Sequence, residues 1–354
     1  MHPTKTQGEA GRFRGDPATA TPTTLRQSRD IVTPALRAAL DRLDETCRAQ
    51  ARYHLGWTTP DGQAAAGGGG KAVRPALALL SARAADAPAE VGLPGAVAVE
   101  LVHNFSLLHD DVMDRDTMRR HRPTVWAVWG VPSAILTGDA LLALAQEVLL
   151  ESGSPHRAAA GTLLATATRD LVRGQVQDLA FEQRTAVTLD ECLDMVTGKT
   201  GALLSASAAI GAVLAGAPAA TTGALASFGA HVGIAFQIVD DLLGIWGDPG
   251  VTGKPVYSDL RARKKTLPMT YAAGQPGAAG ERLARWLAGS DPVDEAALPE
   301  IAALVAAAGG REWAAEEARR RMRLAESALA AAPMPDPPRD ELLALGRFLV
   351  TREA

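Results

Sequence analysis

The chain contains little cysteine, few aromatic residues and no excess of basic charge, and each scarcity excludes a class of protein. Its only cysteines, Cys47 and Cys192, have no metal-binding or redox spacing, which argues against a disulfide framework and favours a reducing compartment. The net charge of −4 gives no overall positive field for nucleic acid or for an anionic membrane. Any anion-binding site must therefore depend on a local group of basic residues.

Long uninterrupted hydrophobic runs are also missing. No apolar stretch reaches the roughly 18 residues that indicate a membrane span, because Gly, Ser, Thr or charged residues interrupt every candidate, including residues 202–220. Residues 1–7 lack the apolar core of a signal peptide. We therefore expect a cytoplasmic protein without an integral membrane segment.

Helical periodicity dominates what is present. No segment shows the alternation of a strand, whereas apolar residues recur at three- to four-residue spacing from about residue 30 onward. The spacing predicts helices over residues 72–86, 92–115, 132–151, 156–183, 189–198, 200–216, 220–246, 261–273, 280–289, 295–308, 310–332 and 338–352.

Two regions follow from this pattern. Residues 1–28 are rich in Thr, Pro, Gly and Ala without periodicity, and we expect a disordered tail, either passive or a docking peptide for a partner. Residues 29–354 show no internal change of composition and are predicted to form one all-α domain, a helical bundle. The longest predicted helices could cross the whole domain and enclose a deep central cavity.

Two clusters of aspartates interrupt otherwise apolar helices. Asp110, Asp111 and Asp114 follow one apolar segment, and Asp240 and Asp241 follow another about 130 residues later. Like charges one helical turn apart cost roughly 0.2–0.5 kcal/mol even when exposed, so positive charge is needed nearby. Hard divalent cations held by a few carboxylates complete their shell with water and phosphate. The two clusters therefore predict a site that handles a diphosphate.

Basic residues follow the first cluster directly. Arg119, Arg120 and Arg122 come within a dozen residues of Asp110. A solvated helix end with salt bridges is one interpretation. The apolar residues just before the aspartates favour the other, a ligand that carries phosphate and metal together, because Arg binds phosphate bidentately.

This string resembles the first aspartate-rich motif of the trans-isoprenyl diphosphate synthases, the polyprenyl synthetase family. Further motifs of the family appear in order over residues 30–352, which is nearly the whole chain. They are Gly70-Lys71 with Arg74, Gly138-Asp139, Gly174-Gln175 with Asp178, Lys199-Thr200, Gln237 with Asp240-Asp241, Lys254, Asp259-Leu260 and Lys264.

The resemblance implies an isoprenoid-synthase-type fold, a homodimer, and transfer of an allylic group to isopentenyl diphosphate with three Mg²⁺ ions. The implied metal-binding residues are Asp110, Asp111, Asp114, Asp240 and Asp241. The residues implied for the allylic diphosphate are Arg119, Lys199, Lys254 and Lys264. Those implied for isopentenyl diphosphate are Gly70, Lys71, Arg74, His103 and Arg120. Thr200 and Gln237 are implied to offer dipoles to the carbocation.

Product length is implied by the residues just before the first cluster. In this family the residue five places earlier helps to limit the product; here it is Phe105, followed by the small Ser106. This pattern is similar to that of synthases making a C20 product, with C15 the next choice. An ordinary core phenylalanine is the alternative.

Two positions depart from the family pattern. Gly244 stands where the family usually has the third aspartate of the second motif, and His121 stands where it more often has glycine. A class I terpene cyclase on the same fold is therefore a second interpretation. A non-catalytic subunit of a heteromeric synthase is a third.

Overall fold

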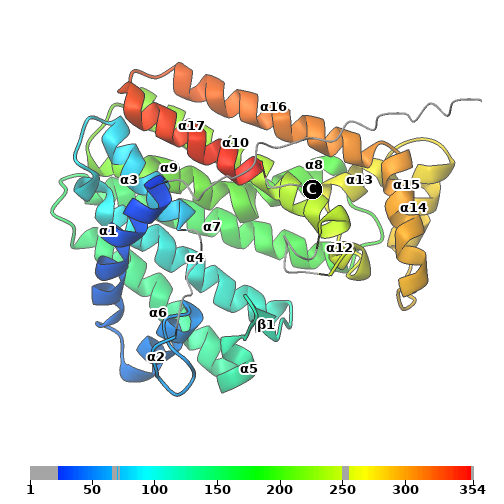
Figure 1. The fold of residues 1–354 in the computed structure, drawn as a ribbon, viewed down its shortest axis with the longest axis horizontal. Helices are drawn as coiled ribbons and strands as arrows, with labels where there is room; N and C mark the ends of the chain where they lie inside the picture. The colour runs from blue at the N-terminus through cyan, green and yellow to red at the C-terminus, as the bar shows by residue number, and fades with distance from the viewer. Residues whose placement is uncertain (1–22, 66–69, 71, 249–254, 352–354) are drawn as a thin grey trace, which may run out of the picture.

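The helices predicted from apolar periodicity form close to where the sequence places them. The computed structural model describes residues 23–65, 70, 72–248 and 255–351, and these form the bundle in Figure 1. Its helices from α1 to α7 are α1 (Thr23–Leu40), α2 (Glu45–His54), α3 (Val73–Ala84), η1 (Ala89–Gly92), α4 (Leu93–Met113), α5 (Val125–Trp129), α6 (Val131–Leu150) and α7 (Arg157–Glu182).

The remaining helices follow the same pattern to the end of the described chain. They are α8 (Leu189–Val196), η2 (Thr197–Gly201), α9 (Ala202–Leu214), α10 (Ala219–Trp246), α12 (Ser258–Arg261), α13 (Leu267–Ala273), α14 (Ala278–Ala288), η3 (Glu295–Ala297), α15 (Leu298–Ala307), α16 (Gly310–Ala330) and α17 (Asp336–Val350).

The centre of the bundle is formed by α4, α9 and α10, with α7 beside them and α16 and α17 across one face (Figure 1). Glycines allow these helices to approach closely. A Cβ on Gly211 of α9 would lie 2.0 Å from the carbonyl oxygen of Ala78 in α3, and one on Gly229 of α10 would lie 2.4 Å from that of Leu204. Only glycine leaves room for this backbone-to-backbone packing.

A two-stranded hairpin follows α4, although the sequence pattern predicts no strand. Strands β1 (Met118–Arg119) and β2 (Arg122–Pro123) pair antiparallel. The two turn residues between them, Arg120 and His121, have φ angles of 51° and 60°. Positive φ at both central positions is the geometry of a type I′ turn. His121 thus holds a backbone conformation that is uncommon for any residue but glycine.

The start of the domain corrects the expected boundary of the tail. Helix α1 already begins at Thr23, so residues 23–28 are helical rather than part of a disordered tail. Leu25 is fully buried, and Thr24 Oγ1 donates a hydrogen bond of 2.9 Å to Glu341 Oε2 on α17. One buried leucine and one polar anchor therefore outweigh the tail-like composition. Residues 1–22 lie outside the described part of the chain.

Two other helix predictions need correction. The expected helix over residues 261–273 is interrupted, because Arg263 has a φ of 46° and separates α12 from α13. The short α5 and the polar α2 lie outside the predicted helices.

Three helices are long and apolar enough to cross a membrane by length and composition alone, contrary to the expectation from interrupted apolar runs. They are the segments Ala89–Met113, Val131–Leu150 and Ala219–Trp246. Gly, Ser and Thr interrupt these runs, but the mean hydropathy of each helix stays as high as that of a membrane span. Within the bundle α4 and α10 pack against other helices and carry the aspartate clusters, which accounts for their apolar character.

Candidate active site

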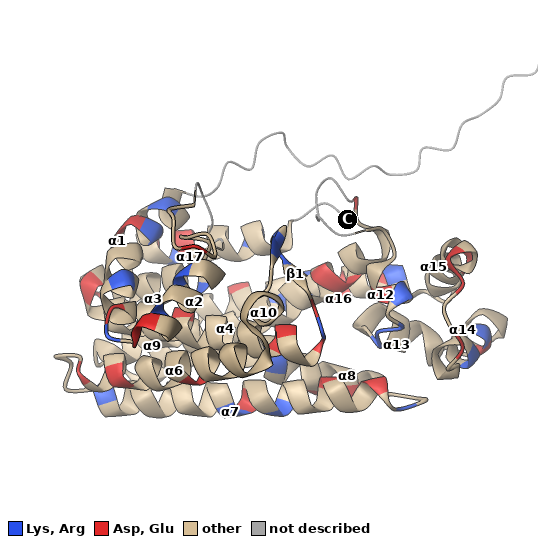
Figure 2. Ribbon diagram, turned by 90° about the horizontal axis from the view of Figure 1, so that it is seen from below, with Lys and Arg blue, Asp and Glu red and all other residues tan. Residues whose placement is uncertain are grey.

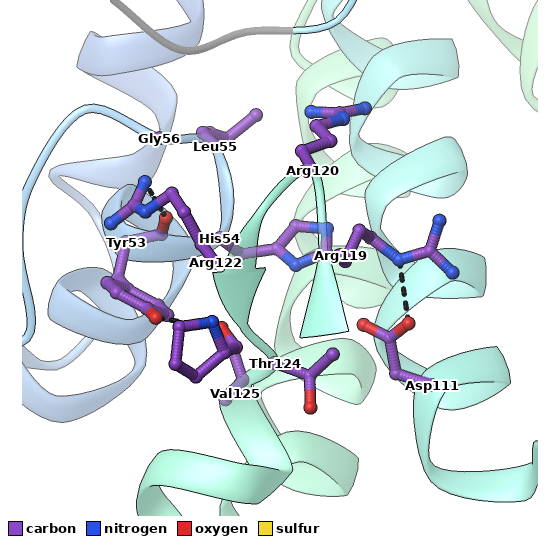
Figure 3. A pocket seen from close by; sticks show the side chains of 11 residues that line it. Tyr53, His54, Leu55, Gly56, Asp111, Arg119, Arg120, Arg122, Thr124 and Val125 are labelled. Atoms are coloured by element: carbon purple, nitrogen blue, oxygen red, sulfur yellow. Dashed lines mark hydrogen bonds and ion pairs between the residues drawn. The ribbon is translucent and has the colours of Figure 1, made fainter. Parts of the chain in front are cut away.

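The first aspartate cluster lies on the last turn of α4, close to the hairpin. Asp111 is 1% exposed, and Arg119 Nε of β1 donates a hydrogen bond of 2.6 Å to its Oδ1 atom (Figure 3). Its Oδ2 atom is buried without a partner among the described residues. Burial raises the pKa of both Asp110 and Asp111 to about 6, although the positive charges of Lys199 and Arg119 respectively oppose it. The neighbouring positive charges therefore compensate these carboxyls only in part.

Lys199 lies close enough to the first cluster for its charge to act on Asp110. It lies in the π-helical η2, and its Nζ atom is 2.5 Å from Oδ2 of Asp178 on α7. A Cβ on Gly174 would lie 2.2 Å from the backbone nitrogen of Lys199. The Gly-Gln-x-x-Asp motif thus has a physical basis: Gly174 admits the η2 backbone, and Asp178 one turn later orients the lysine.

The second cluster lies on α10 and is held by a chain of hydrogen bonds. Asp241 is 5% exposed and accepts hydrogen bonds from Gln237 Nε2 at 2.9 Å and from the Leu267 backbone nitrogen at 3.0 Å. Thr200 Oγ1 in turn donates to Gln237 Oε1 at 2.8 Å. Burial raises the pKa of Asp241 to about 8, and the carboxylate of Asp259 adds to this effect. Thr200 and Gln237 are therefore oriented by each other and by Asp241.

The donor set fits hard divalent cations. Among residues 23–65, 70, 72–248 and 255–351, no three His, Cys, Asp or Glu side chains form a ready metal site. Each cluster could still supply one or two oxygen donors, and water and diphosphate would supply the rest, as Mg²⁺ prefers. The unpartnered oxygen of Asp111 and the raised pKa values of three carboxyls are the features that a bound cation would relieve.

A separate basic pocket forms where α3, α4 and the hairpin turn meet. A Cβ on Gly70 would lie 3.1 Å from Arg120 Nη2. Burial lowers the pKa of Arg74 to about 10, opposed by the nearby Glu100. Burial, followed by the charges of Arg74 and Arg120, also holds the pKa of His103 well below its usual range. The structure thus places Arg74, His103 and Arg120 near one another, and Glu100, for which the sequence gives no signal, partly balances their charge.

The hairpin itself is fixed to the loop after α2. Arg122 donates to the carbonyl oxygens of Tyr53 at 3.2 Å and Thr58 at 2.5 Å, and its guanidinium lies over the Tyr53 ring. A cavity of about 80 Å³ lies beside it, lined by Asp111, the three hairpin arginines and His54 among others (Figure 3). Burial, followed by the charges of Arg120 and Arg119, lowers the pKa of His54 to about 3. Arg122 is thus an anchor, and His54 is a site residue without a sequence signal.

Basic and acidic segments lie close together around the hairpin: Figure 2 shows the blue of β1 close to red segments of the neighbouring helices.

Lys264 is surrounded by carboxylates. Burial lowers the pKa of Lys264, but the carboxylates of Asp259, Asp178 and Asp114 more than offset it, so its pKa is raised. Lys71 and Lys254 lie outside the described residues.

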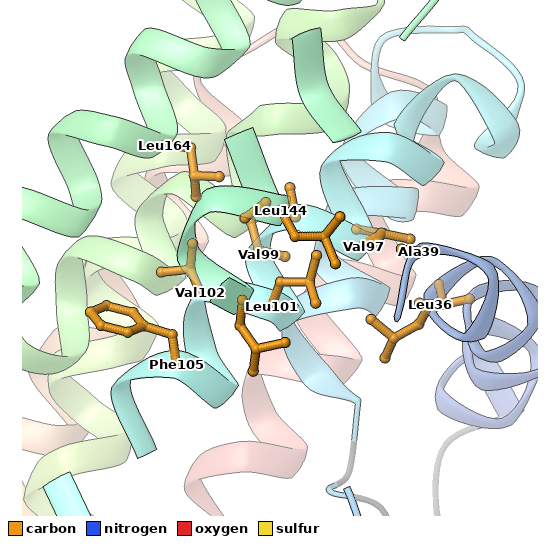
Figure 4. Close-up of a cluster of buried hydrophobic side chains, with 14 of the residues drawn as sticks. Leu36, Ala39, Val97, Val99, Leu101, Val102, Phe105, Leu144 and Leu164 are labelled. Carbon is orange, nitrogen blue, oxygen red and sulfur yellow. The ribbon is translucent and has the colours of Figure 1, made fainter. Parts of the chain in front are cut away.

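Phe105 and Ser106 precede the first cluster on the same helix. Phe105 is 6% exposed, and its ring meets that of His109 edge-on with centroids 4.9 Å apart. Figure 4 shows the ring at one side of the core cluster, pointing away from Leu36. Ser106 Oγ donates to the His103 carbonyl oxygen at 2.9 Å, so it leaves little bulk beside the ring.

Comparison with known proteins gives the family. The polyprenyl synthetase model matches residues 61–305. A (2E,6E)-farnesyl diphosphate synthase of Mycobacterium tuberculosis is 53% identical over 333 residues, 93% of each chain. A geranylgeranyl diphosphate synthase of the same organism is 43% identical over 333 residues, again 93% of each chain. The crystal structure of a polyprenyl synthetase from Streptomyces coelicolor matches with a TM-score of 0.90 at 53% identity, covering 94% of this chain and 100% of that one.

The chain belongs to the polyprenyl synthetase family. It is therefore an enzyme, a prenyltransferase with the all-α isoprenoid synthase fold, and members of this family depend on Mg²⁺. The interpretation as a non-catalytic subunit was wrong. The identity of the product is not settled by these relatives, because both farnesyl and geranylgeranyl diphosphate synthases are among them.

The buried Asp241 predicts how stability depends on pH. In the metal-free folded protein its pKa is about 8, against an ordinary value of 3.8, so the folded state holds one more proton in between. The free energy of unfolding should therefore fall as the pH rises from about 7 to 8, by at most roughly 1.4 kcal/mol per pH unit. His54 and His103 oppose this trend up to about pH 7, because they bind protons in the unfolded state but not in the folded state, and they contribute little above it.

Urea unfolding in the presence of EDTA measures this slope. The Asp241→Asn variant should lose it, whatever its absolute stability. A wild-type stability that stays level or rises over this range would contradict the assignment of the proton to Asp241.

Proposed function

We propose that the enzyme condenses isopentenyl diphosphate with allylic diphosphates and releases diphosphate, and that its terminal product is the C20 compound geranylgeranyl diphosphate. The observation that carries this proposal is the division of the site. Carboxylates that positive charge compensates only in part gather on α4 and α10, whereas a separate pocket on α3, α4 and the hairpin is basic. Two diphosphates would thus be bound by different chemistry.

The aspartate side suits the allylic diphosphate. Asp110, Asp111, Asp114, Asp240 and Asp241 would hold Mg²⁺, which we expect as three ions. Bound Mg²⁺ would neutralise the diphosphate and make it a better leaving group. Arg119, Lys199 and Lys264 would add positive charge to it, as would Lys254 by resemblance alone.

The basic side suits isopentenyl diphosphate. Arg74 and Arg120 are forked donors suited to phosphate, and burial strengthens their attraction for it. Gly70 lies against the Arg120 guanidinium, so a phosphate could approach the backbone there. His103 completes the pocket, and Lys71 joins it by resemblance alone. No carboxylate cluster lies among these residues, so we expect no metal on this side.

The residues between the two pockets suit the reaction. The allylic carbon–oxygen bond would break, the isopentenyl double bond would form the new carbon–carbon bond, and the released diphosphate would accept the proton. Thr200 and Gln237 present oxygens that are already oriented by hydrogen bonds. Such prearranged dipoles stabilise a developing positive charge without reorganisation.

Product length would be limited by Phe105. Its ring stands about 7.5 Å along the helix axis from Asp110, and Ser106 beside it is small. This local pattern favours C20, with C15 next. The higher identity to a farnesyl diphosphate synthase does not outweigh it, because overall identity reports the whole fold whereas length depends on a few side chains.

A homodimer would cover an exposed apolar face on α5 and α6. Val128, Val131, Ile135 and Leu136 on these helices are all at least 36% exposed. An apolar patch of this kind often marks a protein–protein interface.

Turnover tests the proposed function. Purified protein with Mg²⁺, isopentenyl diphosphate and the C5, C10 or C15 allylic diphosphate should yield C20 diphosphate, measured by mass spectrometry. A hydrocarbon product would instead identify a cyclase.

Asp110→Asn should reduce kcat by more than Asp241→Asn, because Asp110 lies in the more accessible, less hydrogen-bonded position. Near-normal rates for both variants would overturn the metal assignment.

Phe105→Ala should lengthen the products beyond C20, since it removes the ring proposed to end the cavity. Phe228→Ala is the matched control: that ring is fully buried in another core cluster, so its loss should cost about 3–5 kcal/mol of stability without changing product length. An unchanged product distribution in Phe105→Ala would remove the proposed role.

Light scattering tests the assembly. The wild type should have twice the chain mass of 36.8 kDa, and Leu136→Glu should shift it toward the monomer by placing a charge in the apolar face. A monomeric wild type would exclude the proposed interface.

A further inference from the structure

A cavity of about 510 Å³ lies at the end of the bundle where α13 and α14 pack together (Figure 1). One wall is formed by residues 185–189, which lead into α8, and the others come from Lys265, α13 and α14. The described residues that line it include none of those proposed to hold metal or diphosphate. Its volume is typical of a site for a small molecule, which is about 300–1,000 Å³.

Most of the cavity wall is apolar. Leu189 contributes from the start of α8, and Ala284 and Leu287 contribute from α14. The two α14 residues are three positions apart, so they share one face of that helix. Tyr271 adds an aromatic side chain, which is stacked on Trp313 with ring centroids 4.7 Å apart. A ligand in this cavity would therefore meet hydrocarbon over most of its surface.

Lys265 is the one charged side chain among the described residues that line the cavity. Burial lowers its pKa, the carboxylate of Glu182 opposes this effect, and the charge of Arg263 adds to it. The pKa remains lowered, so the negative charge near the ammonium group does not compensate its burial. An anionic group in the cavity would supply that compensation.

Thr270 places a second polar group in the wall. It is 5% exposed, and its Oγ1 atom has no hydrogen-bond partner among the described residues. The Cys192 thiol lies close by, but sulfur is a weak acceptor, and the thiol donates to the Lys265 carbonyl oxygen at 3.2 Å. A buried hydroxyl without a partner costs about 1–3 kcal/mol. An acceptor atom of a ligand would remove this cost.

Helix α13 contacts both the cavity and the second aspartate cluster. Its first residue, Leu267, donates a backbone hydrogen bond of 3.0 Å to Asp241 Oδ2, whereas Thr270 and Tyr271 line the cavity. Asp240 and Asp241 are not among the residues that line it. An occupant would thus touch the helix that binds Asp241 without touching the aspartates.

We propose that this cavity binds an amphipathic anion, a hydrocarbon chain that carries one carboxylate or one phosphate group. The head group would accept hydrogen bonds from Lys265 and Thr270, and the chain would lie along Leu189 and Leu287. One lysine suits one anionic group better than the denser charge of a diphosphate, and Glu182 nearby strengthens this preference. Fatty acids and monophosphates of long-chain alcohols share this chemistry.

Isothermal titration calorimetry of the full-length protein tests the proposal. The probes are dodecanoate, dodecyl phosphate and the uncharged dodecanol, each below the concentration at which it forms micelles. At least one of the two anions should bind with one molecule per chain and more tightly than dodecanol. The tighter of the two identifies the head group as carboxylate or phosphate.

Variants place the bound anion in the cavity. Lys265→Gln should weaken binding about 10- to 100-fold, the loss expected for a hydrogen bond to a charged group, and Thr270→Val about 2- to 10-fold. Arg285→Gln is the matched control, because it removes a positive charge from the exposed side of α14 and should bind like the wild type. An anion bound in the active site instead would keep its affinity in Lys265→Gln.

Filling the cavity provides a second arm. Ala284→Trp should abolish binding while the protein still melts cooperatively by circular dichroism. Lys265→Gln and Thr270→Val change the packed volume little, so they decide the question if Ala284→Trp does not fold. No saturable binding of either anion, equal affinity for dodecanol, or wild-type affinity in Lys265→Gln would overturn the proposal.

Discussion

The desolvation of carboxylates at the ends of α4 and α10 is the constraint on which the rest of the site depends. Burial raises the pKa of Asp110 and Asp111 to about 6 and of Asp241 to about 8. Burying ionisable carboxyls close together destabilises the folded state unless positive charge interacts with them. The neighbouring Arg119 and Lys199 offset only part of the cost, which leaves room for divalent cations and a diphosphate.

The backbone brings these charges together through a few unusual conformations. The π-helical η2 places Lys199 against α7, where only a glycine at position 174 admits it. The hairpin turn holds Arg120 at a positive φ, so that Arg119 reaches Asp111 while Arg120 lies against Gly70. Adjacent arginines thereby serve different pockets. Local conformation, rather than residue type alone, separates the two proposed diphosphate sites.

Close packing also shapes the region beside the second cluster. The volume in which a side chain at Gly244 would begin is occupied by the carboxylate of Asp259 from another helix. Helix α12 can therefore lie this close to α10 because residue 244 has no side chain.

The sequence by itself determined the helical architecture, the two aspartate clusters and the basic motifs, because each depends on local periodicity or on residues close in the chain. Apolar spacing located α4, α7 and α10 to within a few residues. It did not reveal the hairpin, the start of α1 at Thr23, or the roles of His54 and Glu100, since these follow from contacts between distant segments. The relation between Gly244 and Asp259 also required the tertiary structure. Fifteen residues apart, they meet only because α12 folds back onto α10, and no local pattern encodes that contact.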